Sequence, residues 1–147
     1  MIQIEKELST AKKASIKSAE LLTGKKTSIN NLISNEGRDV KLQADIESEK
    51  IIKNYLKEFS DLPILAEESG ANEHLGSSFW VVDPLDGTSN YSRDFPICCI
   101  SIALIHENKI TLGVINDFNR NIIYEGSTET PAMMNSKVIT VSDVSDK

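Results

Sequence analysis

The stretch from Trp80 to Asn90 constrains this chain most, because it places an apolar run directly before a proline, two aspartates and a glycine. The apolar residues predict a buried strand, and Pro84 is expected to block its continuation because proline cannot donate to a sheet ladder. Gly87 lets the backbone turn, so that the amides beyond it face the same space as Asp83 and Asp86. Hard oxygen ligands at such a turn favour Mg²⁺ over zinc or copper. The stretch therefore predicts a metal site that handles phosphate.

Composition limits the classes of protein that fit this stretch. A chain of 147 residues with 39% hydrophobic content can bury the core of one domain. Its formal net charge is -6, and the acidic residues are interspersed. Nucleic-acid binding needs clustered Lys and Arg, so we expect no nucleic-acid partner. An acidic protein can bind a phosphate only if a cation stands between them.

The beginning of the chain and its longest apolar runs indicate the compartment. The first residues, Met-Ile-Gln-Ile-Glu-Lys-Glu, lack the basic flank and apolar core of a signal peptide. No run approaches the roughly 18 apolar residues of a membrane span, so we expect no membrane partner. Cys98 and Cys99 are adjacent and lack the spacing of a metal or redox motif. These features predict a cytoplasmic protein with reduced thiols.

Hydrophobic periodicity predicts the secondary structure. Apolar residues at helical spacing predict helices over about Ile2–Leu22, closed by Gly24, and about Ile46–Phe59, with Asp45 as its N-cap. Between them, Lys25–Arg38 is polar and is expected to form a loose loop or a short hairpin. Strands joined by short turns are expected over Leu62–Ala66, Phe79–Val82, Ile97–Ile105, Ile110–Ile115, Ile122–Glu125 and Lys137–Val141. The order predicts an α+β fold in which two helices pack on a largely antiparallel sheet.

The acidic residues also have plainer interpretations. Glu67 and Glu68 follow an expected strand, where a solvated turn is the ordinary reading. The Asp-Gly pair can be a structural turn without ligands. The spacing of the acidic residues around it does not fit a calcium loop of the EF-hand kind. Asp45 taken alone is a helix cap, which is compatible with a site role only if its carboxylate is partly available. These alternatives stay open at the level of residue pattern.

The residues Asp83-Pro84-Leu85-Asp86-Gly87-Thr88, with Glu67-Glu68-Ser69 upstream, resemble the first signature of the inositol monophosphatase family. This family belongs to the Mg-dependent, lithium-sensitive phosphatase superfamily. The resemblance extends to Val40–Asp45 and to the alternating strands from Phe95 to Glu125, so it spans most of the chain. It implies the N-terminal half of that family's αβαβα sandwich.

The resemblance also implies roles for particular residues. Metal ligands would be Glu67, Asp83, the backbone carbonyl of Leu85, and Asp86. Glu68, Thr88 and Asp45 would be catalytic, because they hold or deprotonate the attacking water. The substrate would be bound by Gly87, Thr88 and Asp86, with the phosphate resting on amides at the start of a short helical turn.

The activity implied by the resemblance is Mg-dependent hydrolysis of inositol monophosphate or a related sugar phosphate by metal-activated water. Two or three Mg²⁺ ions, a small phosphorylated substrate and a homodimer would accompany it. The family has a second α/β half whose aspartate completes the second metal site, so residues 1–147 are expected to form the N-terminal metal-binding domain, with the C-terminal half absent. The alternatives are a 3′-nucleotide (bisphosphate) phosphatase or fructose-bisphosphatase of the same superfamily, or a non-catalytic metal-binding module.

Overall fold

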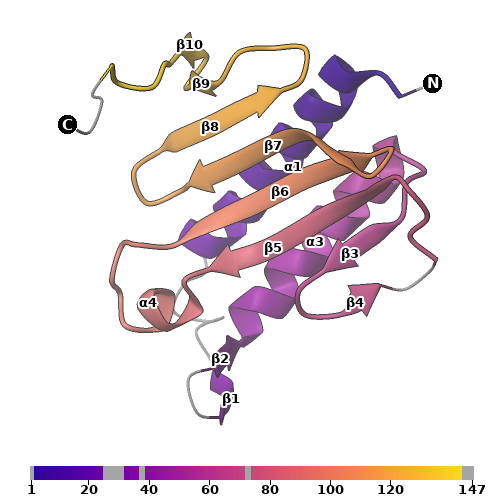
Figure 1. Cartoon of the computed structure of the whole chain (residues 1–147). Helices are drawn as coiled ribbons and strands as arrows, with labels where there is room; N and C mark the ends of the chain where they lie inside the picture. Colours follow the sequence, from indigo (N-terminus) through magenta and orange to yellow (C-terminus); the bar gives the residue numbers. More distant parts are fainter. Residues whose placement is uncertain (1, 25–31, 37–38, 72–73, 144–147) are drawn as a thin grey trace.

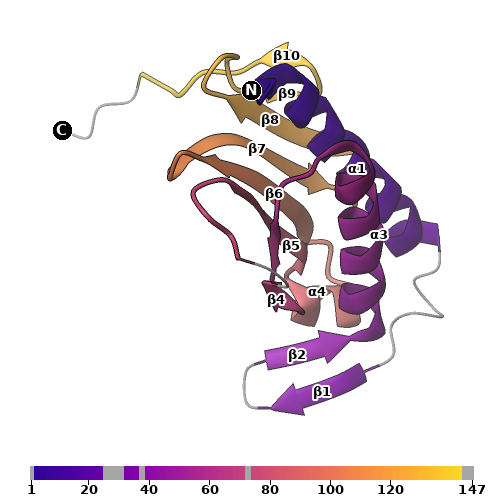
Figure 2. The same ribbon diagram turned by 90° about the vertical axis from the view of Figure 1, so that its right-hand side faces the viewer.

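The computed structural model describes residues 2–24, 32–36, 39–71 and 74–143. In this part of the chain two long helices cover one face of an eight-stranded sheet, as Figures 1 and 2 show. The helices are α1 (Ile4–Gly24), α3 (Gln43–Phe59) and the short α4 (Thr88–Ser92). The strands are β1 (Leu32–Glu36), β2 (Asp39–Leu42), β3 (Ile64–Ala66), β4 (Gly70–Ala71), β5 (Phe79–Asp86), β6 (Cys99–His106), β7 (Lys109–Asp117), β8 (Ile122–Ser127), β9 (Met133–Met134) and β10 (Lys137–Val138).

The large sheet has the order β10-β9-β8-β7-β6-β5-β3-β4. All neighbouring strands in it are antiparallel except β3 and β5, which are parallel with Ala66 opposite Val82. The prediction of an α+β fold with helices on a largely antiparallel sheet is therefore confirmed. Because parallel strands end at the same edge of a sheet, the segments that leave β3 and β5 lie beside each other.

The core lies between the helices and the sheet. Alternate residues of the central strands, such as Trp80, Ile102 and Leu104, are buried, as a period of two requires when one face is covered. They share one apolar cluster with Ile52 and Leu56 of α3. None of the described helices is long and apolar enough to cross a membrane.

A hairpin outside the large sheet leads into α3. Strands β1 and β2 pair antiparallel, which confirms the hairpin alternative for this part of the chain, and Figure 2 shows the pair beyond one end of α3. The remainder of the predicted 25–38 segment, residues 25–31 and 37–38, lies outside the described residues. The helix expected to end at Leu22 continues through Gly24.

Two predictions about local structure are wrong. Pro84 does not end its strand, because β5 continues to Asp86 and the pairing with β6 shifts register between Asp83 and Asp86. A bulge of this kind accommodates proline, which has no N–H to pair. Asp45 is not the N-cap of its helix, because β2 runs directly into α3 and the cap is Leu42. Asp45 is instead the third residue of the helix.

Candidate functional site

The end of β5 turns sharply into α4 through Gly87. Its φ of +86° lies in the left-handed region, and a Cβ at this position would lie 2.7 Å from the carbonyl oxygen of Ile97. Only glycine avoids both the backbone strain and this contact. Thr88 then begins α4, as expected for a short helical turn after the Asp-Gly pair.

The parallel pairing of β3 and β5 brings two acidic residues together. The backbone N–H of Glu67 donates to the carbonyl of Val82 at 3.1 Å, so Glu67 leaves β3 beside Asp83. The two carboxyl groups lie close enough for each to shift the pKa of the other. Asp83 also accepts a hydrogen bond from the backbone N–H of Leu85 at 3.1 Å.

Burial and repulsion raise the pKa values of this pair. Desolvation raises the pKa of Glu67 most, followed by the hydrogen bond with Asp83 and the nearby charges of Asp83, Glu68 and Asp45. Desolvation also raises the pKa of Asp83, and the charges of Asp86 and Glu68 act in the same direction. Glu67 is solvent-exposed, so water screens part of this repulsion. The pair therefore holds protons more tightly than isolated carboxylates do.

Asp45 reaches the same edge of the sheet from α3. One carboxylate oxygen accepts a hydrogen bond from the backbone N–H of Leu42 at 2.7 Å, and the other accepts one from Thr88 Oγ1 at 2.8 Å. Thr88 Oγ1 also lies 3.0 Å from the carbonyl oxygen of Leu85. Asp45 is only 1% exposed, and this burial raises its pKa to about 6, although both hydrogen bonds act against the shift. The Asp45 carboxylate therefore accepts hydrogen bonds both at the start of α3 and from the Thr88 hydroxyl.

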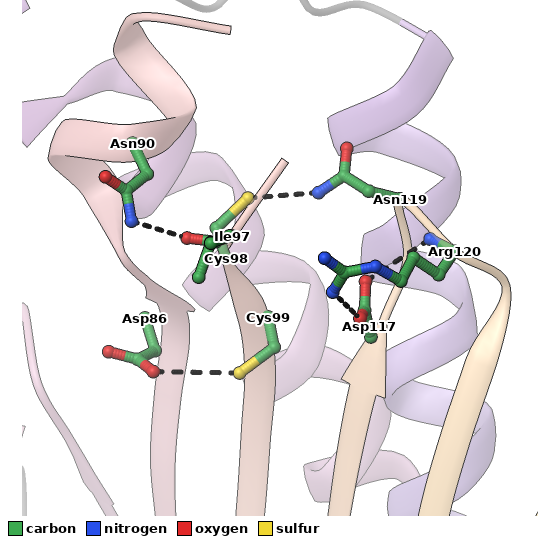
Figure 3. A network of polar contacts seen from close by, with 8 residues as sticks. All are labelled: Asp86, Asn90, Ile97, Cys98, Cys99, Asp117, Asn119 and Arg120. Carbon is green, nitrogen blue, oxygen red and sulfur yellow. Dashed lines mark hydrogen bonds and ion pairs between the residues drawn. The ribbon is translucent and has the colours of Figure 1, made fainter. Parts of the chain in front are cut away.

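Asp86 lies at the exposed end of β5 and faces β6. Figure 3 shows its side chain directed at Cys99, whose Sγ lies 3.7 Å from Asp86 Oδ2. Burial, followed by the charge of Asp86, raises the pKa of Cys99 to about 12, so this sulfur remains a thiol. Neither Cys98 nor Cys99 forms a disulfide.

A cavity of about 200 Å³ opens beside Asp86. Its lining includes Cys99, Asp117 and Arg120, and the last two form an ion pair at 2.7 Å (Figure 3). Asn90 of α4 donates from Nδ2 to the carbonyl of Ile97 at 2.7 Å, which ties the helical turn to the segment before β6. Sequence reasoning did not single out this cavity or these contacts.

Glu68 completes the group of predicted site residues. Its backbone N–H donates to Glu49 Oε2 of α3 at 2.8 Å, and its charge contributes to the raised pKa of Asp45 and Asp83. Sequence reasoning missed Glu49, and also Ser48, whose Oγ donates to the carbonyl of Pro84 at 2.7 Å. Their positions three and four residues after Asp45, on one helix face, were the available signal.

The donor chemistry of the site fits a hard cation. The neighbouring carboxyl groups of Glu67 and Asp83 supply hard oxygen donors, and a divalent cation between them would relieve the repulsion of their charges. Among the described residues, no three His, Cys, Asp or Glu side chains are gathered closely enough to hold a metal by themselves. A metal here would therefore also need backbone oxygens, water or groups beyond the carboxylate pair.

Comparison with known proteins identifies the family. The model of the inositol monophosphatase family matches residues 3–147. The chain belongs to this family. The resemblance carried by the Asp83–Thr88 signature is thereby confirmed.

Individual relatives agree with this assignment. The chain is 39% identical over 119 residues to the Nus factor SuhB of Xylella fastidiosa, covering 79% of this chain and 42% of that protein. It is 33% identical over 147 residues to the fructose-1,6-bisphosphatase/inositol-1-monophosphatase of Aquifex aeolicus, covering 97% of this chain and 55% of the relative. The solved inositol monophosphatase of Anabaena (Nostoc) sp. superposes with a TM-score of 0.81 at 30% identity, over 97% of this chain and 52% of that one. The chain thus spans about half the length of the relatives it matches.

Proposed function

We propose that this chain carries most of the active site of a Mg²⁺-dependent phosphomonoesterase that hydrolyses inositol monophosphate or a related sugar phosphate. The observation that carries the proposal is the Thr88 hydroxyl, held by buried Asp45 at the same sheet edge as the Glu67 and Asp83 carboxyl pair. The names of the Aquifex and Anabaena relatives support the substrate class.

The proposed cation ligands are Glu67, Asp83, the carbonyl of Leu85, and Asp86, for two or three Mg²⁺ ions. Bound Mg²⁺ supplies Lewis acidity toward the phosphoryl oxygens and the attacking water. The residues themselves supply hard oxygen donors from two strands that end at one edge. Their raised pKa values mean that protons compete with the cation for the same oxygens.

Thr88 and Asp45 are proposed to move the proton of the attacking water. When the Thr88 hydroxyl donates to Asp45, its oxygen lone pairs remain available to accept a hydrogen bond from water. A pKa of about 6 leaves Asp45 ionised near neutral pH, yet more basic than an ordinary aspartate. Glu68 is proposed as the second carboxylate that orients or deprotonates this water.

Gly87, Thr88 and Asp86 are proposed to bind the substrate. The first amides of α4 have no partner within the helix, and the left-handed turn at Gly87 precedes them. Asp86 borders the 200 Å³ cavity, where its carboxylate can accept hydrogen bonds from sugar hydroxyl groups. Homodimer formation, a cytoplasmic location and the absence of a nucleic-acid partner remain predictions from the sequence.

Replacement of Asp83 by Asn tests the proposal. The substitution keeps the shape but removes one charge, so phosphate release from inositol 1-phosphate with Mg²⁺ present should fall by roughly a hundredfold or more, the scale of losing a key transition-state contact. Release near the parent rate would overturn it. A 3′-phosphorylated nucleotide and fructose 1,6-bisphosphate in the same assay distinguish the other superfamily activities.

A non-catalytic metal-binding module is the second candidate function. The relative from Xylella fastidiosa is named as a Nus factor, which is not the name of a hydrolase. Calorimetric titration with Mg²⁺, run beside the phosphate-release assay, separates the two candidates. Metal binding without hydrolysis of any of the three substrates favours the module.

A further inference from the structure

Helix α3 has a buried polar face that is directed at the proposed site. Asp45, Ser48 and Glu49 lie on it at helical spacing and are 1%, 0% and 5% exposed. We call these three residues the α3 polar face. Farther along the helix the buried positions are apolar, as at Ile52 and Leu56. The polarity of the buried face therefore changes where the helix passes the site.

Each residue of the α3 polar face bonds a different segment of the site. Asp45 accepts from the Thr88 hydroxyl at the start of α4. Ser48 donates to the carbonyl of Pro84, inside the bulge of β5. Glu49 accepts from the backbone N–H of Glu68, in the turn after β3. One helix thus connects to all three segments that carry the proposed ligands and catalytic groups.

The serine of this face is itself held by a second helix. Ser18 of α1 is fully buried, and its Oγ lies 2.6 Å from Ser48 Oγ. Since the single Ser48 proton goes to Pro84, Ser18 is the donor to Ser48. Both helices therefore contribute to the position of the β5 bulge.

Glu49 is fixed through both of its oxygens. While Oε2 accepts from the Glu68 amide, Oε1 lies 3.6 Å from Lys53 Nζ, one helical turn farther on. Lys53 Nζ in turn donates to Ser69 Oγ at 2.6 Å. The pair of Glu49 and Lys53 therefore contacts the turn after β3 at two successive residues, Glu68 and Ser69.

Buried polar groups of this kind are poor choices for stability alone. Burial of a carboxylate is costly even when it is paired, and apolar residues of similar size often stabilise a core as well or better. The apolar residues farther along the same face show that α3 can pack without polar groups. What the polar groups add is a defined position for each backbone segment that they bond.

We propose that Glu49 is a positioning residue that holds the Glu67–Ser69 turn, and with it the Glu67 and Glu68 carboxylates, in register with Asp83. The inference rests on the proposed function, because its consequence is a site ordered for Mg²⁺. Glu49 acts through the Glu68 amide and through Lys53, and it touches neither substrate nor metal.

Three variants of the 147-residue chain test the inference. Glu49→Met keeps the volume of the side chain but removes both acceptors. Glu49→Gln retains one oxygen that can accept from the Glu68 amide. Glu58→Gln, at an exposed position of α3, is the matched control. The measurements are hydrogen exchange of the Glu68 amide without metal and calorimetric Mg²⁺ affinity.

Glu49→Met should speed exchange of the Glu68 amide by about tenfold or more and weaken Mg²⁺ binding by a similar factor, because a charged acceptor is lost. Glu49→Gln should restore most of both properties. If Glu49→Met does not fold, Glu49→Asp, which retracts the acceptor by one methylene, replaces it with the same expectation. Parent-like exchange of the Glu68 amide in a folded Glu49→Met or Glu49→Asp protein would overturn the inference. A parent chain that binds no Mg²⁺ would count against the proposed function instead, and exchange would still decide the role of Glu49.

Discussion

Asp45 offers a quantitative test of the site through its pKa. In Asp45→Asn, the side-chain oxygen can keep the hydrogen bond from the Leu42 N–H, and the new amide can donate to Thr88 Oγ1. The Thr88 proton then turns to the carbonyl of Leu85, which already lies 3.0 Å away. The variant therefore satisfies every group of the parent and should fold, without the charge.

The expected change in stability follows from the raised pKa of Asp45. Burial raises the pKa of Asp45 from 3.8 to about 6, and each pKa unit corresponds to about 1.4 kcal/mol. The folded protein binds this proton more tightly than the unfolded chain does. Its contribution to stability is therefore complete below about pH 4 and is lost as the pH rises through about 6. Ionisation of Asp45 should cost the folded protein roughly 3 kcal/mol, a cost that asparagine does not have.

Urea denaturation of the metal-free parent and variant at about pH 4 and about pH 8 measures this cost. The difference in unfolding free energy between the two proteins should move by roughly 2.5 kcal/mol in favour of Asp45→Asn between these pH values, because at about pH 4 Asp45 is already partly ionised in the unfolded chain. Subtracting the unfolding free energy of one protein from that of the other at each pH cancels the effect of other carboxyl groups whose titration is independent of Asp45. Glu58→Gln, an exposed control on the same helix, should show almost no such change. A difference that is equal at both pH values would refute the reasoning.

Other perturbations test neighbouring parts of the structure. Gly87→Ala should lower the unfolding free energy by roughly 3 kcal/mol or more, because a positive φ and a backbone contact at 2.7 Å act together. Gly76→Ala, where φ is also positive but no atom lies near the new Cβ, should lower it by only about 1 kcal/mol. Urea denaturation measures both. Equal costs would contradict this account. Tyr91→Phe should lower the unfolding free energy by about 1–2 kcal/mol, because it removes the hydroxyl that donates to the buried carbonyl of Leu22 at 2.7 Å. An unchanged urea midpoint would argue against that hydrogen bond. Calorimetric Mg²⁺ affinity should fall as the pH falls from about 8 to about 6, because protons compete for the raised-pKa carboxyl of Glu67, and a flat profile would count against a metal at that residue.

Local patterns allowed the sequence to predict the strand that carries Asp83. The apolar run before Asp83 indicated a buried strand, and an earlier apolar run placed Glu67 and Glu68 after another strand. The parallel pairing that brings these two strand ends to one edge was not predicted. Helical periodicity likewise located α1 and α3 to within a few residues of their ends. These features depend on neighbours along the chain, which the sequence displays directly.

Features that depend on contacts between residues far apart in the chain could not be predicted from the sequence. Pro84 ordinarily ends a strand, but pairing with β6 carries β5 past it through a bulge. Asp45 has the chemistry of an N-cap, yet the direct junction with β2 moves the cap to Leu42. Ser48 and Glu49 share a helix face with Asp45, but their spacing does not show which distant segments bury and bond them. Each of these outcomes was decided by tertiary contacts.

The parallel pairing of β3 and β5 has a consequence for variation among related proteins. Because Glu67 and Asp83 are placed by the ends of two paired strands, their separation does not depend on the length of the segment that joins those strands. Insertions or deletions between Ser69 and Phe79 can therefore change this connection while leaving the carboxyl pair in place. The end of this segment contacts the turn between β6 and β7, at the other end of the strands from Asp83, so its length can vary without displacing the acidic residues.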